Sequence, residues 1–130
     1  MESQVFFAGA VVAHQPPARE KSNKWYIKIE EYEYNVYPPF VNAGAYVMSR
    51  HTMKRIFLAS HYVKKFRFDD IYLGIIAKKC GIIPYRSKSF WRRRGPFSGT
   101  NMKSAIASHL YYERDKLEDI WLQQVKLGNA

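Results

Sequence analysis

The sequence predicts a single α/β domain, because short β-rich apolar runs alternate with amphipathic segments of helical spacing along its 130 residues. The order from residue 43 to residue 85 is strand, helix, connector, helix, strand. Hydrophobic residues make up 47% of the chain and aromatic residues 16%, which is enough to bury a core and excludes a disordered tail.

Two strands are expected in the first part of the chain. Val5–Val12 is an apolar run closed by His14–Pro17, which indicates a buried strand followed by an exposed loop. Lys24–Ile29 alternates apolar and polar residues and predicts a second strand. Pro38 and Pro39 then exclude a helix at that point.

A third strand and the first helix come next. Asn42–Ser49 begins with small residues and continues as a strand, with Gly44 either in a tight turn or where backbone approaches a ligand closely. Ser49 is a suitable N-cap for a helix over Arg50–Ser60, whose apolar face would carry the side chains Met53, Ile56 and Phe57.

Two adjacent carboxylates open the second helix, which is expected to run to Cys80 and to stop at Gly81. Asp69 would accept the free N–H groups of the first turn as N-cap, and Asp70 would project toward a ligand. Both carboxylates would also complement the helix dipole, which is worth some tenths to about 1 kcal/mol, so the spacing alone leaves both roles open.

The last third of the chain predicts one more strand and one more helix. Ile82–Tyr85 is typical of a short strand, and Asp115 with Glu118 forms the pattern of a capping box for a helix that continues through Val125. His109 lies at the edge of an apolar stretch, where a histidine is either a packing residue or a ligand.

The charge of the chain indicates an anionic partner. There are 21 Lys and Arg residues against 11 Asp and Glu residues, a net charge of +10, which suits nucleic acid, phospholipid headgroups or a phosphorylated small molecule. The basic and aromatic stretch Arg86–Arg94 favours nucleic acid and supports an alternative function as a small nucleic-acid-binding module. However, the stretch lacks a recognition helix, an RNP pattern and zinc-finger spacing, and it would equally face a pyrophosphate or solvent.

Several classes of chemistry are excluded by what the sequence lacks. Cys80 is the single cysteine, which rules out an internal disulfide and a cysteine metal cluster. The chain contains no phosphate-binding glycine loop, no GxSxG and no HExxH motif, so hydrolase and kinase functions have no residues to support them. No apolar run approaches the ~18 residues of a membrane span.

Five motifs in order, and a late Ile106–His109 segment, carry a resemblance to a known family. The motifs are Lys24-Trp25-Tyr26, Glu31-Tyr32, Tyr37-Pro38-Pro39-Phe40, Ala43–Ser49 and Phe68–Gly74. In this series the chain resembles the C-terminal half of the β-1,3-glycosyltransferases of the galactosyltransferase family, and most of all the Brainiac-type β-1,3-N-acetylglucosaminyltransferases. The likeness extends from about Phe7 to the end of the chain.

The resemblance implies a GT-A fold, a Rossmann-like α/β sandwich, and an inverting transfer of GlcNAc or Gal from a UDP-sugar in β-1,3 linkage. It implies Mn²⁺ or another divalent cation, a glycolipid or glycoprotein glycan as acceptor, no nucleic-acid partner, and a lumenal catalytic domain held at the Golgi membrane by an N-terminal anchor. It assigns Asp70 as catalytic base and His109 as metal ligand. The residues expected to bind substrate are Asp69, Gly44, Tyr46, Trp25 and Lys24.

One departure from the family pattern affects the expected extent of the chain. The Asp-x-Asp metal motif of the family belongs upstream of these motifs, and no Asp-x-Asp occurs in the sequence. Residues 1–130 are therefore expected to be the C-terminal portion of a single catalytic domain, without the UDP-binding half, the stem and the membrane anchor, and to be inactive alone. A transferase-like domain that only scaffolds or chaperones is a further alternative, and it would keep its fold without binding UDP.

Overall fold

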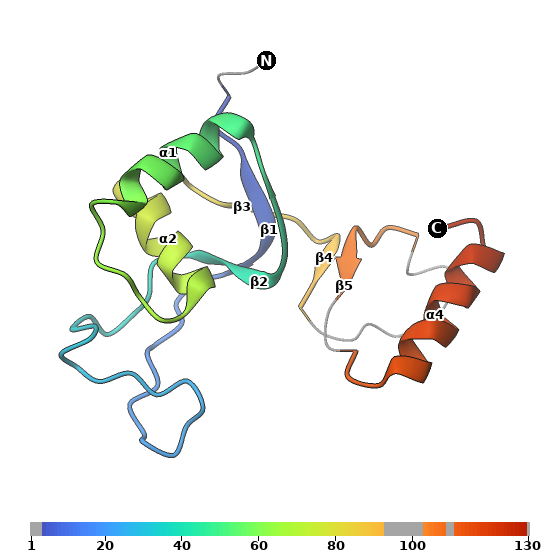
Figure 1. Ribbon diagram of the computed structural model, residues 1–130, viewed down its shortest axis with the longest axis horizontal. Coiled ribbons are helices and arrows are strands. Elements are labelled where there is room, and N and C mark those ends of the chain that lie inside the picture. Colours follow the sequence, from blue (N-terminus) through green and yellow to red (C-terminus); the bar gives the residue numbers. More distant parts are fainter. Residues whose placement is uncertain (1–3, 93–102, 109–110, 130) are drawn as a thin grey trace.

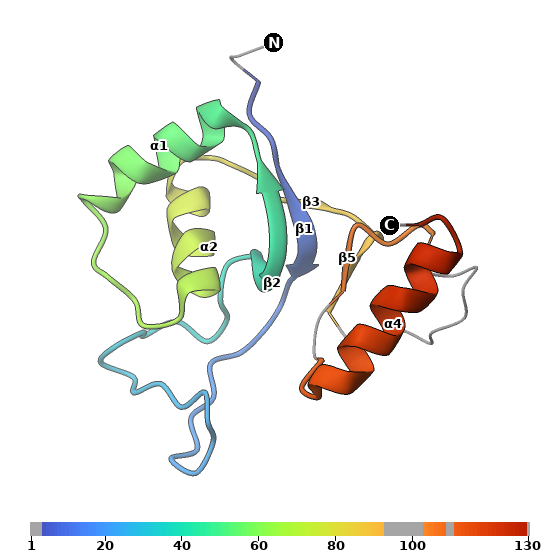
Figure 2. The same cartoon turned by 45° about the vertical axis from the view of Figure 1, so that its right-hand side comes forward.

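The computed structural model describes residues 4–92, 103–108 and 111–129 of the chain, and they form a mixed α/β structure, as predicted (Figure 1). The elements are β1 (Phe7–Val12), β2 (Phe40–Met48), α1 (Arg50–Ser60), α2 (Asp69–Lys79), β3 (Tyr85–Arg86), β4 (Phe90–Trp91), β5 (Ala107–Ser108) and α4 (Arg114–Lys126). Helices α1 and α2 lie on one side of the main sheet, and β4, β5 and α4 lie on the other (Figures 1 and 2). In the part of the chain that is described, no helix has the length and hydropathy needed to span a bilayer.

The main sheet has the strand order β2-β1-β3, with β1 antiparallel to β2 and parallel to β3. The β1–β2 ladder shifts register between Gly9, which is opposite Tyr46, and Val11, which is opposite Val41. Two steps along β1 therefore match five steps along β2, and the extra residues of β2 form a bulge. Gly44 lies inside this bulge of β2, so of its two expected roles the tight turn before the strand was wrong.

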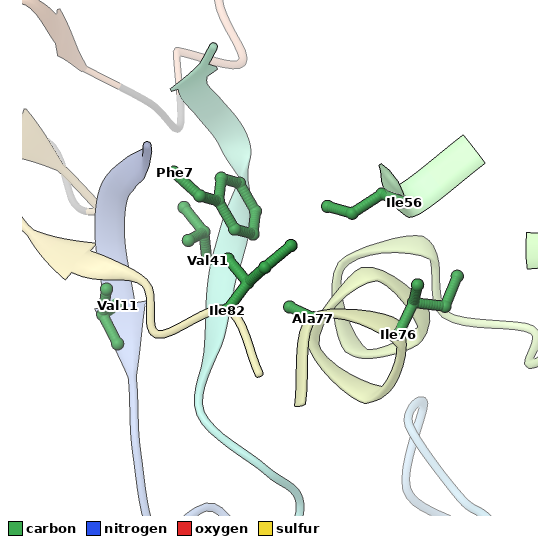
Figure 3. Close-up of a cluster of buried hydrophobic side chains, with 7 residues drawn as sticks. All are labelled: Phe7, Val11, Val41, Ile56, Ile76, Ala77 and Ile82. Carbon is green, nitrogen blue, oxygen red and sulfur yellow. The ribbon is translucent and has the colours of Figure 1, made fainter. Parts of the chain in front are cut away.

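The core fills the space between the sheet and the two helices (Figure 3). Its largest cluster consists of Phe7, Val11, Val41, Ile56, Ile76, Ala77 and Ile82. Helix α2 approaches β2 closely at Gly74, where a Cβ atom would lie 2.6 Å from the Cβ of Phe40 and 3.1 Å from the carbonyl oxygen of Pro39. Glycine is required at this position because any side chain would meet the strand.

Helix α1 begins as predicted but buries a different face. The Ser49 hydroxyl accepts the Thr52 N–H and caps the helix. Thr52 and Ile56 are the buried residues, whereas Met53 and Phe57 are exposed, so the predicted apolar face was only partly right. The reason is a contact with the chain just before β1, where the Thr52 hydroxyl accepts the N–H of Phe6 at 2.9 Å and turns that side of the helix inward.

The strand predicted over Lys24–Ile29 does not form. Only Tyr26 pairs, in an isolated β-bridge with Ala18, and turns flank it on both sides. Of this segment only Ile27 is fully buried, and the Asn23 side chain accepts the Trp25 N–H in a local turn. The loop is held by the guanidinium of Arg19, which donates to the carbonyl oxygens of Ile27, Tyr32 and Tyr34 at 3.0, 2.6 and 3.2 Å. Alternation in the sequence predicted a strand, but these bonds satisfy the backbone without one.

Two predicted caps were wrong, whereas a helix end was confirmed. The N-cap of α2 is Phe68, without a side-chain bond, and Asp69 is the first helical residue. The N-cap of α4 is Glu113, one residue before the helix, and its carboxylate pairs with Lys116 at 2.6 Å, so no Asp115–Glu118 capping box forms. Helix α2 ends at Lys79, one residue before the predicted Cys80, which is its C-cap, and the predicted stop at Gly81 is confirmed by a φ of +67°.

Candidate functional site

A cleft of about 700 Å³ lies where the end of β1, the start of β2 and the N-terminus of α2 meet. This is the carboxyl end of the parallel strand β1, the edge at which α/β sheets usually bind ligands. The volume is typical of a site for a small molecule. The walls include Gln15, Asn23, Trp25, Tyr37, Asn42, Ala43, Gly44, Arg67, Phe68, Asp69, Asp70 and Arg92.

The carboxyl group of Asp70 is held at the junction of helix and strand. Its Oδ1 accepts the N–H of Ile71 at 2.8 Å, and the backbone N–H of Ala43, in the β2 bulge, faces the same carboxyl and lowers its pKa. The side chain is half-buried, and burial raises the pKa of Asp70 above its ordinary value of 3.8. The backbone N–H groups of Ile71, Ala43 and Asp70 itself oppose this rise in the pKa, while the neighbouring Asp69 carboxylate adds to it.

The remaining walls of the cleft combine aromatic rings with cations. The ring of Trp25 contacts that of Phe68 edge to face, with 5.2 Å between the centroids. The Lys24 ammonium lies 5.0 Å from the centroid of Trp25, and the Arg67 guanidinium lies 5.1 Å from that of Phe68. Arg92 enters from the segment after β4, so one residue of the basic stretch reaches the cleft. Such a surface suits a sugar ring and an anionic group together.

The structure brings most of the predicted site residues together. Asp69, Asp70, Gly44 and Trp25 all line the cleft, and Lys24 adjoins it through the Trp25 ring. Tyr46 is not among the lining residues, and its ring packs edge to face on that of Phe7 at 5.7 Å. The predicted metal ligand His109 lies outside the described residues.

Some cleft residues were not predicted. Arg67 and Asn42 line the cleft, and neither belongs to a recognisable chemical motif. The Tyr37 hydroxyl lies on the same wall, is fully buried, and has no hydrogen-bond partner among the described residues. Its place in the Tyr37–Phe40 motif was the available signal. Burial also raises the pKa of the Tyr37 hydroxyl, which keeps it in the protonated form.

The described residues do not by themselves fit Mn²⁺. Among them there is no group of three or more His, Cys, Asp or Glu side chains that would hold a metal ion. Asp69 and Asp70 supply two carboxyl groups, but that of Asp70 already accepts the backbone N–H of Ile71.

Comparisons with known proteins place the chain in a family. The family model described as galactosyltransferase matches residues 1–88. The beta-1,3-galactosyltransferase brn of Drosophila melanogaster is 36% identical over 121 residues, which cover 92% of this chain and 37% of that protein. The lactosylceramide 1,3-N-acetyl-beta-D-glucosaminyltransferase of Mus musculus is 31% identical over 121 residues, covering 91% and 31%.

A third relative gives the same result. Lactosylceramide 1,3-N-acetyl-beta-D-glucosaminyltransferase A of Xenopus laevis is 30% identical over 127 residues, covering 96% of this chain and 33% of that protein. The chain thus spans about a third of the length of the curated relatives it matches. Its motifs, its cleft and the family match agree, and the chain belongs to the galactosyltransferase family.

Proposed function

We propose that this chain supplies the base and the acceptor side of an inverting β-1,3-hexosyltransferase, which moves GlcNAc or Gal from a UDP-sugar to a glycan hydroxyl. The observation that carries the proposal is the Asp70 carboxyl group, pinned between α2 and the β2 bulge on the wall of the large cleft. Membership of the galactosyltransferase family supports the class of reaction.

Asp70 acts in a single displacement. Its carboxylate takes the proton of the acceptor hydroxyl while that oxygen bonds to the anomeric carbon and the bond from this carbon to the UDP oxygen breaks. One displacement inverts the anomeric carbon. The raised pKa of Asp70 strengthens the carboxylate as a base.

The other cleft residues bind and orient the substrates. The Asp69 carboxylate accepts a hydrogen bond from a sugar hydroxyl. The rings of Trp25 and Phe68 pack on a face of the sugar, and Lys24 lies beside them. The guanidinium groups of Arg67 and Arg92 face an anionic group, which in this function is the donor pyrophosphate. Gly44, without a side chain, lets the acceptor approach the β2 bulge.

We extend three further properties of the family to this chain. They are a GT-A fold of which residues 1–130 form the C-terminal portion, a divalent cation such as Mn²⁺ with His109 as a ligand, and a lumenal position at the Golgi membrane. Relatives named lactosylceramide N-acetylglucosaminyltransferases favour UDP-GlcNAc and a glycolipid acceptor, and the relative named a galactosyltransferase keeps UDP-Gal as an alternative. Neither the family nor these relatives support the nucleic-acid alternative.

The test compares Asp70→Asn with Asp69→Asn in the complete catalytic domain. Each variant removes one carboxylate at the start of α2 and keeps its size, so the pair separates base catalysis from a general charge effect. With UDP-GlcNAc or UDP-Gal, Mn²⁺ and lactosylceramide, we expect Asp70→Asn to lower kcat by about 10²-fold or more, with UDP affinity unchanged. Asp69→Asn should act mainly on KM.

Two results would contradict the proposal. Normal transfer by Asp70→Asn would show that Asp70 is not the base and only places a charge at the start of the helix. A folded wild-type protein that binds no UDP would instead favour the scaffolding alternative.

A further inference from the structure

The Tyr37 hydroxyl is a buried polar group that the fold leaves without a partner. Tyr37 is 4% exposed, and its hydroxyl makes no hydrogen bond with the described residues. A buried hydroxyl without a bond is rare in folded proteins, because the group has lost its bonds to water without replacing them. Base catalysis by Asp70 gives this hydroxyl no role, although both residues line the same cleft.

The ring of Tyr37 is packed from several sides, so the hydroxyl has little freedom to turn outward to water. Its centroid lies 4.9, 6.0 and 6.4 Å from those of Tyr32, Phe66 and Phe40. The backbone N–H of Tyr37 donates to the carbonyl oxygen of Gln15 at 2.9 Å. A hydroxyl on a ring that is held in this way keeps one position, which is what the recognition of a single ligand atom requires.

The charged groups near this hydroxyl do not supply the acceptor that its proton needs. Burial raises the pKa of the Tyr37 hydroxyl, and the charges of Arg19 and Arg67 lower it. A guanidinium group has no acceptor atom. The carboxylate of Glu31 has the smallest effect on this pKa, is exposed, and already accepts the N–H of Lys28 at 3.0 Å. The missing partner is therefore an acceptor oxygen that these residues do not provide.

A ligand in the cleft reaches the Tyr37 hydroxyl only when a covering side chain moves. Arg67 is suited to this movement, because it lines the cleft, is exposed, and makes no hydrogen bond or ion pair with the described residues. Its guanidinium rests on the Phe68 ring, 5.1 Å from the centroid. A cation–π contact at an exposed site is weak, so Arg67 changes its rotamer at little cost.

We propose that the Tyr37 hydroxyl binds a hydroxyl group of a sugar in the cleft and so helps to determine which sugar is accepted. This role rests on the proposed function, in which Asp70 deprotonates one hydroxyl of a sugar held in the same cleft. A second hydroxyl of a sugar is an acceptor for the Tyr37 proton. A phosphate oxygen would accept it too, but the rings of Trp25 and Phe68 in this cleft favour a sugar ring.

The experiment compares the wild type with Tyr37→Phe in the complete catalytic domain, because this change removes only the hydroxyl. The acceptors are methyl β-lactoside and its monodeoxy analogues. We expect Tyr37→Phe to lower kcat/KM for the full sugar by about tenfold. One analogue should lower the value for the wild type by a similar factor and should not lower that for Tyr37→Phe further, because both changes remove the same hydrogen bond. Monodeoxy UDP-sugars, tested in the same way, show whether the partner hydroxyl belongs to the donor.

Tyr32→Phe is the matched control. The Tyr32 ring packs on that of Tyr37, but its hydroxyl donates to the carbonyl oxygen of Val36 at 3.1 Å, and Tyr32 is not among the residues that line the cleft. This variant should rank the analogues as the wild type does. Without ligand, Tyr37→Phe should raise the Tm by roughly 2–4 °C, because an unpaired buried hydroxyl is removed, whereas Tyr32→Phe should not raise it.

A measurement without turnover separates this role of Tyr37 from the proposed function. Methyl β-lactoside alone should raise the Tm of the wild type more than that of Tyr37→Phe, because a ligand stabilises in proportion to its affinity. This shift needs neither the donor nor the base. If the wild type shows the shift but transfers no sugar, the proposed function fails and the Tyr37 contact stands.

Four results would overturn the role of Tyr37. A loss of kcat/KM in Tyr37→Phe that leaves the ranking of all analogues unchanged would mean that only the packing is disturbed. A lower Tm for ligand-free Tyr37→Phe would show a fixed partner, either an ordered water or another part of the protein. An equal response of the Tm to the sugar in the wild type and Tyr37→Phe would show that no contact forms. A response lost in Arg67→Ala and kept in Tyr37→Phe would assign the sugar to Arg67.

Discussion

At the scale of the residue, the position of Asp70 has a consequence for stability as well as for chemistry. A raised pKa means that the folded protein holds the Asp70 proton more tightly than the unfolded chain does. Ionisation of Asp70 therefore destabilises the fold. This destabilisation is absent below the unfolded value of 3.8, grows as the pH rises, and is complete above the folded pKa.

From this we expect Asp70→Asn to raise the Tm at pH 7, although the same change removes the proposed base. Asparagine still accepts the N–H of Ile71 but carries no half-buried charge. Below pH 3.8 the difference from the wild type should disappear, because Asp70 is then protonated in both states. Thermal unfolding followed by circular dichroism at the two pH values measures this. A lower Tm at pH 7 would show that the charge stabilises the fold through its N–H donors.

At the scale of the element, the close packing of α2 on β2 depends on a glycine, Gly74, at the contact. In an ordinary helix interior, Gly→Ala stabilises by about 1 kcal/mol. In α2 the Gly74 position leaves only 2.6 Å between a new Cβ and that of Phe40, and the Pro39 carbonyl oxygen is backbone that cannot rotate away. Overpacking therefore outweighs the helix propensity.

We predict that Gly74→Ala lowers the free energy of unfolding by about 1–3 kcal/mol, measured by urea denaturation. Gly81→Ala is the control, because Gly81 has φ of +67° but no atom near the new Cβ, so its cost is backbone strain alone, about 1 kcal/mol. The close packing of α2 on β2 would be refuted if Gly74→Ala were more stable than the wild type.

At the scale of the whole molecule, the two core clusters lie within the first 82 residues. The second cluster consists of Val12, Tyr37, Phe40 and Ile71, which adjoin the cleft. Strands β4 and β5 contact the far side of the sheet, and α4 lies beyond β5 (Figure 2). The family match also ends at residue 88, close to the end of β3.

A chain that ends at Lys88 should therefore keep a cooperative unfolding transition, because its buried clusters remain complete. We expect its near-ultraviolet circular dichroism to persist, with a lower midpoint in urea from the loss of the contacts of β4 and β5 with the sheet. A broad transition without near-ultraviolet signal would show instead that β4, β5 and α4 are required for the packing of the first 88 residues.

Much of the fold was predictable because it depends on short-range chemistry. Ser49 caps α1 and Gly81 terminates α2, since a side-chain acceptor and a positive φ act within a few residues. The pair of carboxylates at the start of α2 was visible for the same reason. The Lys24–Ile29 segment was misjudged because its conformation depends on a side chain outside it: the guanidinium of Arg19 donates to the carbonyl oxygen of Ile27, and to those of Tyr32 and Tyr34 further along the loop.

The sequence by itself predicted β1, β2, α1, α2 and α4 in their order, the end of α2 before Gly81, the family, and the presence of two acids at a helix start. Only the tertiary structure decided which α1 side chains face water, that Asp70 and not Asp69 is held by bonds, and that Trp25, Gly44 and Arg92 share one cleft with them. The physical reason is the distance along the chain over which each interaction acts. Capping and helix propensity act along the chain over one or two turns, whereas burial, a raised pKa and a cleft arise from groups that meet only after the chain has folded.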